Sequence, residues 1–207
     1  GFPLPVLALT EKQCSHIQAP ALNAFLSKVH LNQHTARSIV HGPTEYGGLS
    51  IPHAYYMQSS GQLNLLVSHL RANDKTSNLI RISMSYLQLL SGSNVPFLHL
   101  PFSKYAKWIE PSWLRSIWEF TSRVNFTVNV RNSWTPAIQR TNDLSLMDFF
   151  LTLRFKPKQL QILNRCRLYL QVIFLSDIVS ADDTTIIPHV LSGQKLTDRI
   201  SMMKWPV

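Results

Sequence analysis

Apolar side chains recur every three or four residues along most of this chain, and this spacing constrains the fold more than any other feature. The recurrence covers residues 10–29, 53–72, 77–90, 111–124 and 157–175. A period near 3.6 residues places such side chains on one face of an α-helix, whereas a strand would show strict alternation. Shorter helices are expected over 35–40 and 143–153. The sequence therefore predicts a mainly α fold.

The start of the first helix is marked by Thr10 and Gln13. Their spacing is that of a capping box, in which the two side chains bond each other's backbone N–H groups. The apolar residues at helical spacing are then Cys14, Ile17, Ala21, Ala24, Phe25 and Val29. Pro20 lies inside this pattern and predicts a kink or a break, because proline has no N–H to donate.

Two domains are expected, a helical bundle in residues 1–92 and a second helical region in 93–207. Gly92 lies where the C-terminal cap of the preceding helix belongs. In the second region, residues 125–130 alternate apolar and polar side chains and predict a strand. Residues 184–191 are its candidate partner, so a minor β hairpin is expected.

The paired glycines in EYGGLSIP are the most specific local feature. Glycine permits positive φ angles and the close approach of another backbone segment. Gly47, Gly48 and Pro52 are therefore expected to form a structured loop. On these residues alone, the loop is structural.

The chain is basic, with 20 Lys and Arg against 11 Asp and Glu, a formal net charge of +9 and a pI near 9.8. This surplus favours a polyanionic partner, because binding releases counterions condensed on a phosphate backbone. Dispersed charge with no such partner is equally compatible with the composition. Two sets of basic residues stand out, Lys28, His30, His34 and Arg37 in one, and Arg154, Lys156, Lys158, Arg165 and Arg167 in the other.

Motifs for metal binding and for hydrolase or nucleotide chemistry are absent from the sequence. Cys14 and Cys166 lack CxxC spacing and are expected as buried thiols of a reducing compartment, the nucleus or the cytoplasm. No HExxH, GxSxG or phosphate-binding glycine motif occurs. No apolar run approaches the roughly 18 residues of a membrane span. We therefore expect no metal, no cofactor and no membrane partner for this chain.

Three tryptophans, Trp113, Trp118 and Trp134, are candidates for stacking on nucleic-acid bases. The helical stripe already accounts for Trp113, and large aromatic side chains are commonly buried. Packing in the core is therefore the favoured interpretation for these residues.

Several motifs together resemble the segment just beyond the polymerase palm in reverse transcriptases of LINE-like and related eukaryotic retroelements. They cover most of the chain and are PLPVLALTEKQCSHIQAPALNAFL, HTARSIVHGPTEYGGLSIPHAY, ISMSYLQLLSG, SWLRSIWEF and LNRCRLYLQVIFLSDI. In that family a PLP-type segment closes the palm, and a Gly-Gly-Leu-Gly motif followed by Ile or Leu and then Pro lies in the helical thumb. Ser50 stands at the fourth position of this motif, which is a departure from the family.

The resemblance implies a thumb-like helical bundle followed by a connection-like region, both cut from a longer retrotransposon polypeptide. Such a fragment of an RNA-directed DNA polymerase would grip the template–primer backbone, with Lys28, His30, His34 and Arg37 facing it. The implied partners are nucleic acid, as RNA/DNA hybrid or duplex, and the upstream palm of the same polypeptide. Mg²⁺ is expected in that palm, outside this chain.

The turn SADD imitates the aromatic-x-Asp-Asp hairpin that holds Mg²⁺ in this family. Asp182 and Asp183 form it, but Ser180 replaces the aromatic residue. The best further carboxylate, Asp148, lies in an expected amphipathic helix instead of a palm strand. We therefore expect no catalytic residue and no enzyme activity in this chain alone, and interpret the acidic pair as part of a chain turn.

Two other functions are compatible with the residues. A sequence-specific DNA-binding module for integration targeting would present Arg, Asn or Gln to base edges, but the sequence shows no zinc knuckle or convincing helix-turn-helix. A degenerate transposon fragment would bind nothing.

Overall fold

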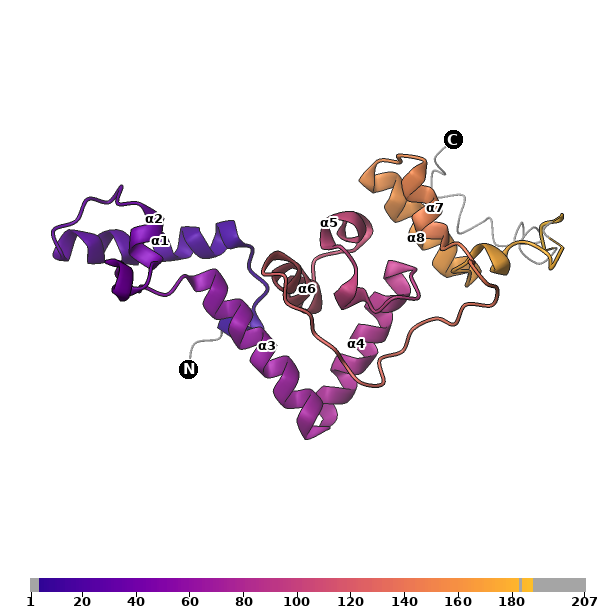
Figure 1. Ribbon diagram of the computed structural model, residues 1–207, viewed down its shortest axis with the longest axis horizontal. Coiled ribbons are helices and arrows are strands. Elements are labelled where there is room, and N and C mark those ends of the chain that lie inside the picture. Colours follow the sequence, from indigo (N-terminus) through magenta and orange to yellow (C-terminus); the bar gives the residue numbers. More distant parts are fainter. Residues whose placement is uncertain (1–3, 183, 188–207) are drawn as a thin grey trace. The chain divides into compact units, whose positions relative to one another are not determined.

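The computed structural model describes residues 4–182 and 184–187, and this part is mainly helical, as the sequence predicts (Figure 1). Its α-helices are α1 (Glu11–Lys28), α2 (Arg37–His41), α3 (Ala54–Ala72), α4 (Lys75–Ser91), α5 (Phe102–Tyr105), α6 (Trp113–Arg123), α7 (Leu146–Thr152) and α8 (Pro157–Leu170). Short 3-10 helices are η1 (Leu4–Val6), η2 (Thr44–Tyr46), η3 (Phe97–His99), η4 (Ala106–Trp108) and η5 (Leu175–Asp177).

The described residues form two compact units that differ from the division expected at residue 92. The first unit comprises residues 4–74 and 111–120, and the second comprises the remainder. The helix α4 belongs to the second unit because it packs with η3 and α8. Most of α6 returns to the first unit, where Phe120 packs against Cys14 and Tyr55. Each unit is described by itself below.

In the first unit, the backbone that precedes α1 is held by side-chain donors. Gln58 and Gln62 lie one turn apart on α3, and both are fully buried. Three alternate carbonyls accept from side chains, which are Trp113 Nε1 to Pro5 (2.8 Å), Gln62 Nε2 to Leu7 (2.5 Å) and Gln58 Nε2 to Leu9 (2.9 Å). The Leu9 N–H donates in turn to Gln58 Oε1 at 3.2 Å. These side chains thus supply hydrogen-bond partners to the backbone of residues 5–9 from other parts of the unit.

The helix α1 begins with the predicted capping box. The Gln13 N–H donates to Thr10 Oγ1, and the Thr10 N–H donates to Gln13 Oε1. The sequence predicts a kink or a break at Pro20, and the break does not occur, because α1 continues through Pro20 as one helix. Pro20 and His16, four residues before it, are both exposed, so water can bond the His16 carbonyl that proline leaves unpaired.

The buried face of α1 differs from the expected one. Leu22 and Leu26 are buried and pack with Val40 of α2. Of the residues expected on the apolar face, Ile17 and Phe25 are instead exposed, at 62% and 42%. The short helix α2 and the loop after it cover one side of α1, and this tertiary contact decides which residues are buried.

The glycine-rich loop folds back on α2 and joins it to α3. The Leu49 N–H donates to the Ile39 carbonyl at 2.9 Å, which lays the loop along the helix. Gly47 has a φ of +76°, and a Cβ on Gly48 would lie 2.2 Å from the carbonyl oxygen of Gly42. Gly47 is therefore required by its left-handed backbone conformation, and Gly48 by the close approach of the Gly42 backbone.

Gln18 connects this loop to α1. Its Nε2 donates to the Pro52 carbonyl at 2.7 Å, and its Oε1 accepts from the Ala54 N–H at 3.0 Å. The amide of Gln18 therefore bonds the backbone on both sides of His53, at Pro52 and at Ala54, where α3 begins. His53 caps the helix, with Nδ1 accepting from the Tyr55 N–H.

In the second unit, the buried side chain of Arg167 holds the end of α4 against α8. It is 2% exposed and donates to the carbonyls of Leu89 and Val172. Burial lowers the pKa of Arg167 to about 10, since the guanidinium has left water. Gly92 ends α4 with a φ of +68°, as predicted, and a Cβ there would come within 3.2 Å of the guanidinium carbon.

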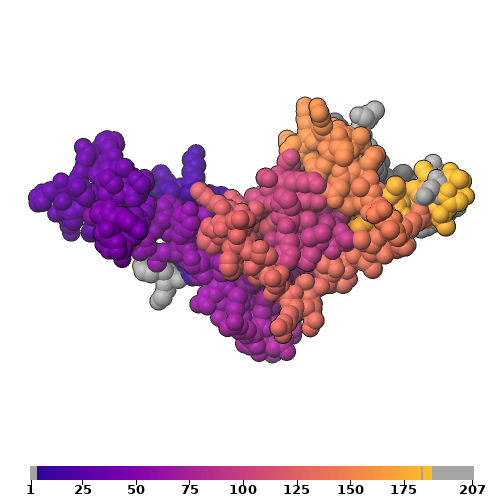
Figure 2. Space-filling model, in the orientation of Figure 1, coloured from indigo at the N-terminus to yellow at the C-terminus, as the bar shows by residue number. Residues whose placement is uncertain are grey.

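The strand expected over 125–130 is not formed. These residues lie in a long connection between α6 and α7 (Figures 1 and 2), where His99 Nε2 lies 3.2 Å from the carbonyl oxygen of Val128. In the described part of the chain, β pairing consists of two isolated antiparallel bridges, Ser145 with Phe174 and Val179 with Ile186. Ile186 of the proposed partner segment thus pairs locally, and residues 188–191 lie outside the described residues.

Replacing Gln58 with Leu should lower the free energy of unfolding by about 1–3 kcal/mol, because the partly buried N–H and C=O of Leu9 both lose their partner. Asn64→Leu on the exposed side of α3 is the matched control and should change it by less than about 0.5 kcal/mol. Urea unfolding followed by circular dichroism measures both variants. Equal effects would show that the two bonds to Leu9 do not stabilise the fold.

Arg167→Met should destabilise the protein by about 2–4 kcal/mol, because it leaves several buried oxygen atoms without a donor. Arg165→Met removes the same kind of side chain from the same helix. Arg165 is exposed and lies 3.4 Å from Glu110, so its loss should cost less than about 1 kcal/mol. Thermal and urea unfolding compare the two variants, and a larger cost for Arg165→Met would contradict the role given to Arg167.

Candidate nucleic-acid interface

The four residues of the first basic set lie on the connection between α1 and α2. Lys28 is the last residue of α1 and Arg37 the first of α2, and His30 and His34 lie between them. All four side chains are exposed. The structure therefore places all four side chains at the surface, along the one connection between α1 and α2.

Local hydrogen bonds shape this connection. The N–H of His34 donates to Asn32 Oδ1 at 2.8 Å, and the N–H of Thr35 donates to the Asn32 carbonyl at 2.9 Å. His30 has a φ of +57°, which turns the chain directly after α1. The short helix α2 has no side-chain cap at its start. The side chains of the basic set are left outside this bonding, apart from a contact of 3.4 Å between His34 Nε2 and Gln33 Nε2.

The surroundings of the set contain little negative charge. No Asp or Glu occurs between Glu11 and Glu45 in the sequence. Lys28 and Arg37 supply two permanent positive charges, and the histidines add charge only when protonated. The set can therefore attract phosphate. When the two histidines are neutral, only Lys28 and Arg37 contribute positive charge.

The net positive charge lies mainly in the second unit, which sequence spacing did not reveal. Among the described residues, the first unit has five Lys and Arg against four Asp and Glu, whereas the second has twelve against five. The asymmetry is hidden along the sequence because the first unit combines residues 4–74 with residues 111–120. The second unit therefore attracts a polyanion more strongly than the first unit does.

The second basic set does not form one surface. Arg154, Lys156 and Lys158 are exposed around the start of α8. Arg165 faces Glu110, and Arg167 is buried against backbone carbonyls. Arg167 is therefore unable to meet a phosphate, and Arg165 is exposed but shares its charge with Glu110.

The carboxylate of Asp148 accepts hydrogen bonds from two side chains of α5. Its Oδ1 accepts from Lys104 Nζ at 2.7 Å and from the Tyr105 hydroxyl at 2.6 Å, which ties α7 to α5. Burial, with Asp148 next to it, raises the pKa of Tyr105 to about 12. The hydrogen bond to Asp148 is the main cause of a raised pKa at Lys104.

The turn with Asp182 also has a structural explanation. Asp182 accepts from the hydroxyls of Ser180 and Thr184, and these bonds lower its pKa to about 2. It lies in an exposed turn beside the bridge between Val179 and Ile186. Asp183 lies outside the described residues.

The described residues also contain both cysteines. Cys14 and Cys166 are free and buried, as predicted, and burial raises the pKa of both thiols. In residues 4–182 and 184–187, no group of three or more His, Cys, Asp or Glu side chains could hold a metal ion. Within the same residues, no helix is both long enough and apolar enough to cross a bilayer.

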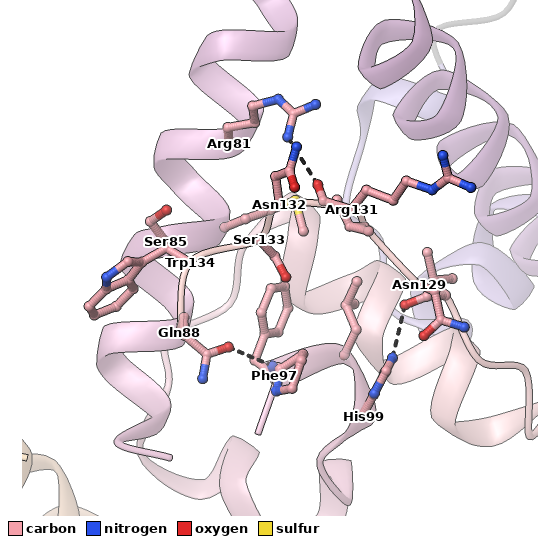
Figure 3. Close-up of a pocket in the computed structure, with 15 residues that line it drawn as sticks. Arg81, Ser85, Gln88, Phe97, His99, Asn129, Arg131, Asn132, Ser133 and Trp134 are labelled. Atoms are coloured by element: carbon pink, nitrogen blue, oxygen red, sulfur yellow. Dashed lines mark hydrogen bonds between the residues drawn. The ribbon is translucent and has the colours of Figure 1, made fainter. Parts of the chain in front are cut away.

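The three tryptophans have different environments. Trp118 is fully buried, as expected for packing in the core, whereas Trp113 is half-buried and donates to the Pro5 carbonyl. Trp134 is 47% exposed, which contradicts the expectation of packing in the core. It lines a pocket of about 220 Å³ in the second unit, between α4, η3 and the connection that contains it (Figure 3).

Asp148→Asn should reduce stability most at neutral pH. A raised pKa at Tyr105 and at Lys104 means that their contribution is complete below their ordinary values near 10 and is lost as the pH rises towards 12. We expect a cost of about 1–2 kcal/mol at pH 8, shrinking between pH 10 and 11, measured by urea unfolding. Asp182→Asn is the control, because Asp182 is ionised throughout this range. A cost that stays constant with pH would contradict this coupling.

A scan against protein-family models, a search of curated proteins and a search of solved structures found no match to this chain. What the chain does is therefore inferred from its own motifs, from the exposure of its side chains and from the distribution of its charges.

Proposed function

We propose that this protein binds the phosphate backbone of a template–primer duplex, as the region that follows the palm of a retroelement reverse transcriptase. The observation that carries the proposal is the exposed set of Lys28, His30, His34 and Arg37 on one connection. The neighbouring sequence has no carboxylate from residue 12 to residue 44. The motifs that resemble the family cover most of the chain and support the same role.

Binding of this kind is electrostatic. Lys and Arg displace the counterions condensed on phosphate, so affinity falls steeply as salt is added. Phosphate groups carry no base identity, so unrelated sequences are bound alike. The exposed cations at the start of α8 add to the attraction without forming a second designed site.

The remaining parts of the proposal concern the polypeptide from which this chain comes. Nucleotide transfer takes place in an upstream palm of the same polypeptide, which holds Mg²⁺, and this chain supplies no catalytic group. The partners are therefore that palm and an RNA/DNA hybrid or duplex. The site of action is the nucleus or the cytoplasm.

Lys28→Ala and Arg37→Ala should each weaken binding of the full chain to a labelled duplex by a similar factor for two unrelated sequences. Each loss of one phosphate contact should lower the slope of log K against log salt by roughly 0.9. Fluorescence anisotropy at several salt concentrations measures affinity and slope together.

Lys156→Ala and Lys158→Ala are the matched controls, because they remove the same charge from another exposed surface. Smaller effects from these two changes are expected. Equal effects from both pairs would mean that diffuse charge, not the connection after α1, binds the duplex. A loss confined to one DNA sequence would instead favour the module for integration targeting, and absence of binding at low salt would favour the non-binding fragment.

A further inference from the structure

The pocket beside Trp134 is the clearest unassigned cavity among the described residues. Its walls are α4, η3 and the connection through residues 128–134. The connection is held at two points, where Arg81 Nη1 donates to the Arg131 carbonyl at 3.5 Å and where His99 Nε2 lies 3.2 Å from the Val128 oxygen. Figure 3 shows both contacts, with Trp134 at the opposite edge from His99 and Phe97 next to Gln88.

The floor of the pocket is built by Gln88, which is 2% exposed. Its Nε2 donates to the carbonyls of Ser93 (2.6 Å) and Val95 (2.8 Å), and its Oε1 accepts from the Phe97 N–H at 2.7 Å. One buried amide thus fixes the chain between α4 and η3 and places the Phe97 backbone. The cavity is therefore formed before any ligand arrives, which lowers the entropy cost of binding.

The lining favours a planar ring joined to an anion. Arg81, Arg131 and His99 line the pocket, and no Asp or Glu is among its lining residues. The half-exposed indole of Trp134 offers a face for stacking. Asn132 brings an amide that can both donate to and accept from the edge of a polar ring.

The volume limits the size of the occupant. About 220 Å³ is less than the roughly 300–1,000 Å³ of pockets for drug-sized ligands. A single base with part of its sugar suits this space, and the phosphate joined to that sugar can lie at the edge beside Arg81. A duplex keeps its base faces stacked inside the helix and cannot present one. The excess of basic residues in the second unit supplies charge complementarity for the rest of a strand.

We propose that this pocket binds one unpaired nucleotide of a single-stranded nucleic acid, with the base stacked on Trp134 and the phosphate near Arg81. The inference rests on the proposed function in that both require nucleic-acid binding. It adds a site in the other compact unit and a preference for unpaired bases, which backbone contacts alone do not provide.

The test is the affinity of the full chain for a labelled dT oligonucleotide, the same strand in a duplex, and an abasic strand of equal length. Trp134→Ala should weaken binding of the dT strand roughly 5- to 150-fold, the usual effect of losing one stacked base. The duplex and the abasic strand should change less than twofold. Trp134→Phe should restore most of the affinity, because phenylalanine also stacks.

Tyr86→Ala is the matched control, since Tyr86 is an exposed aromatic residue of α4, 58% exposed, that does not line the pocket. It should leave all three affinities unchanged. Circular dichroism and thermal unfolding verify that the variants keep the fold. If Trp134→Ala does not fold, Trp134→Leu keeps an apolar side chain without an aromatic face and should weaken binding of the dT strand in the same way.

Three results would overturn the inference. If the wild type binds strand and duplex but Trp134→Ala and Trp134→Phe bind both normally, the pocket inference fails while the proposed function stands. If the wild type binds neither, both fail together. If a polyglutamate peptide binds in a Trp134-dependent way and the dT strand does not, the pocket takes an acidic peptide instead.

Discussion

Backbone polar groups in the connections between the helices need hydrogen-bond partners, and in this protein buried side chains supply many of them. The β pairing of the described residues consists of two isolated bridges, so strand pairing does not supply these partners. An unpaired buried carbonyl costs about 1–3 kcal/mol, so the donors decide which connections keep one position. They are Gln58, Gln62 and Trp113 in the first unit, and Gln88, Trp108 and Arg167 in the second.

The same constraint explains where the candidate interface lies. The connection between α1 and α2 satisfies its backbone through bonds among its own residues, such as those to Asn32. No buried donor draws it inward, so Lys28 and Arg37 remain on the surface. Arg167 shows the opposite outcome. Its buried guanidinium donates to the carbonyls of Leu89 and Val172. It therefore cannot contact a phosphate outside the protein.

The second unit combines most of the positive charge with a connection that forms no strand over residues 124–134. Residues 128–134 cross α4 and η3 without strand pairing, and the side chains of Arg81 and His99 bond to their backbone. Space is left between these bonds, and Trp134 borders it. A backbone phosphate surface in one unit and a ring-sized pocket in the other would allow one chain to meet both paired and unpaired nucleic acid.

Helix positions and many helix ends follow from local sequence alone, because capping and backbone conformation involve residues a few positions apart. The capping box at Thr10 and the left-handed cap at Gly92 are examples. The exposure of the basic set after α1 is likewise compatible with its position between two helices.

Burial was decided by tertiary structure, because it depends on what packs from elsewhere in the chain. Periodicity alone did not select Leu22 and Leu26 over Ile17 and Phe25, since that choice was made by α2 and its loop. Nor could charge patterns separate buried Arg167 from exposed Arg165, two residues away on one helix. The alternation in 125–130 indicated an extended backbone, but a strand also needs a partner, and the chain places side-chain donors there instead.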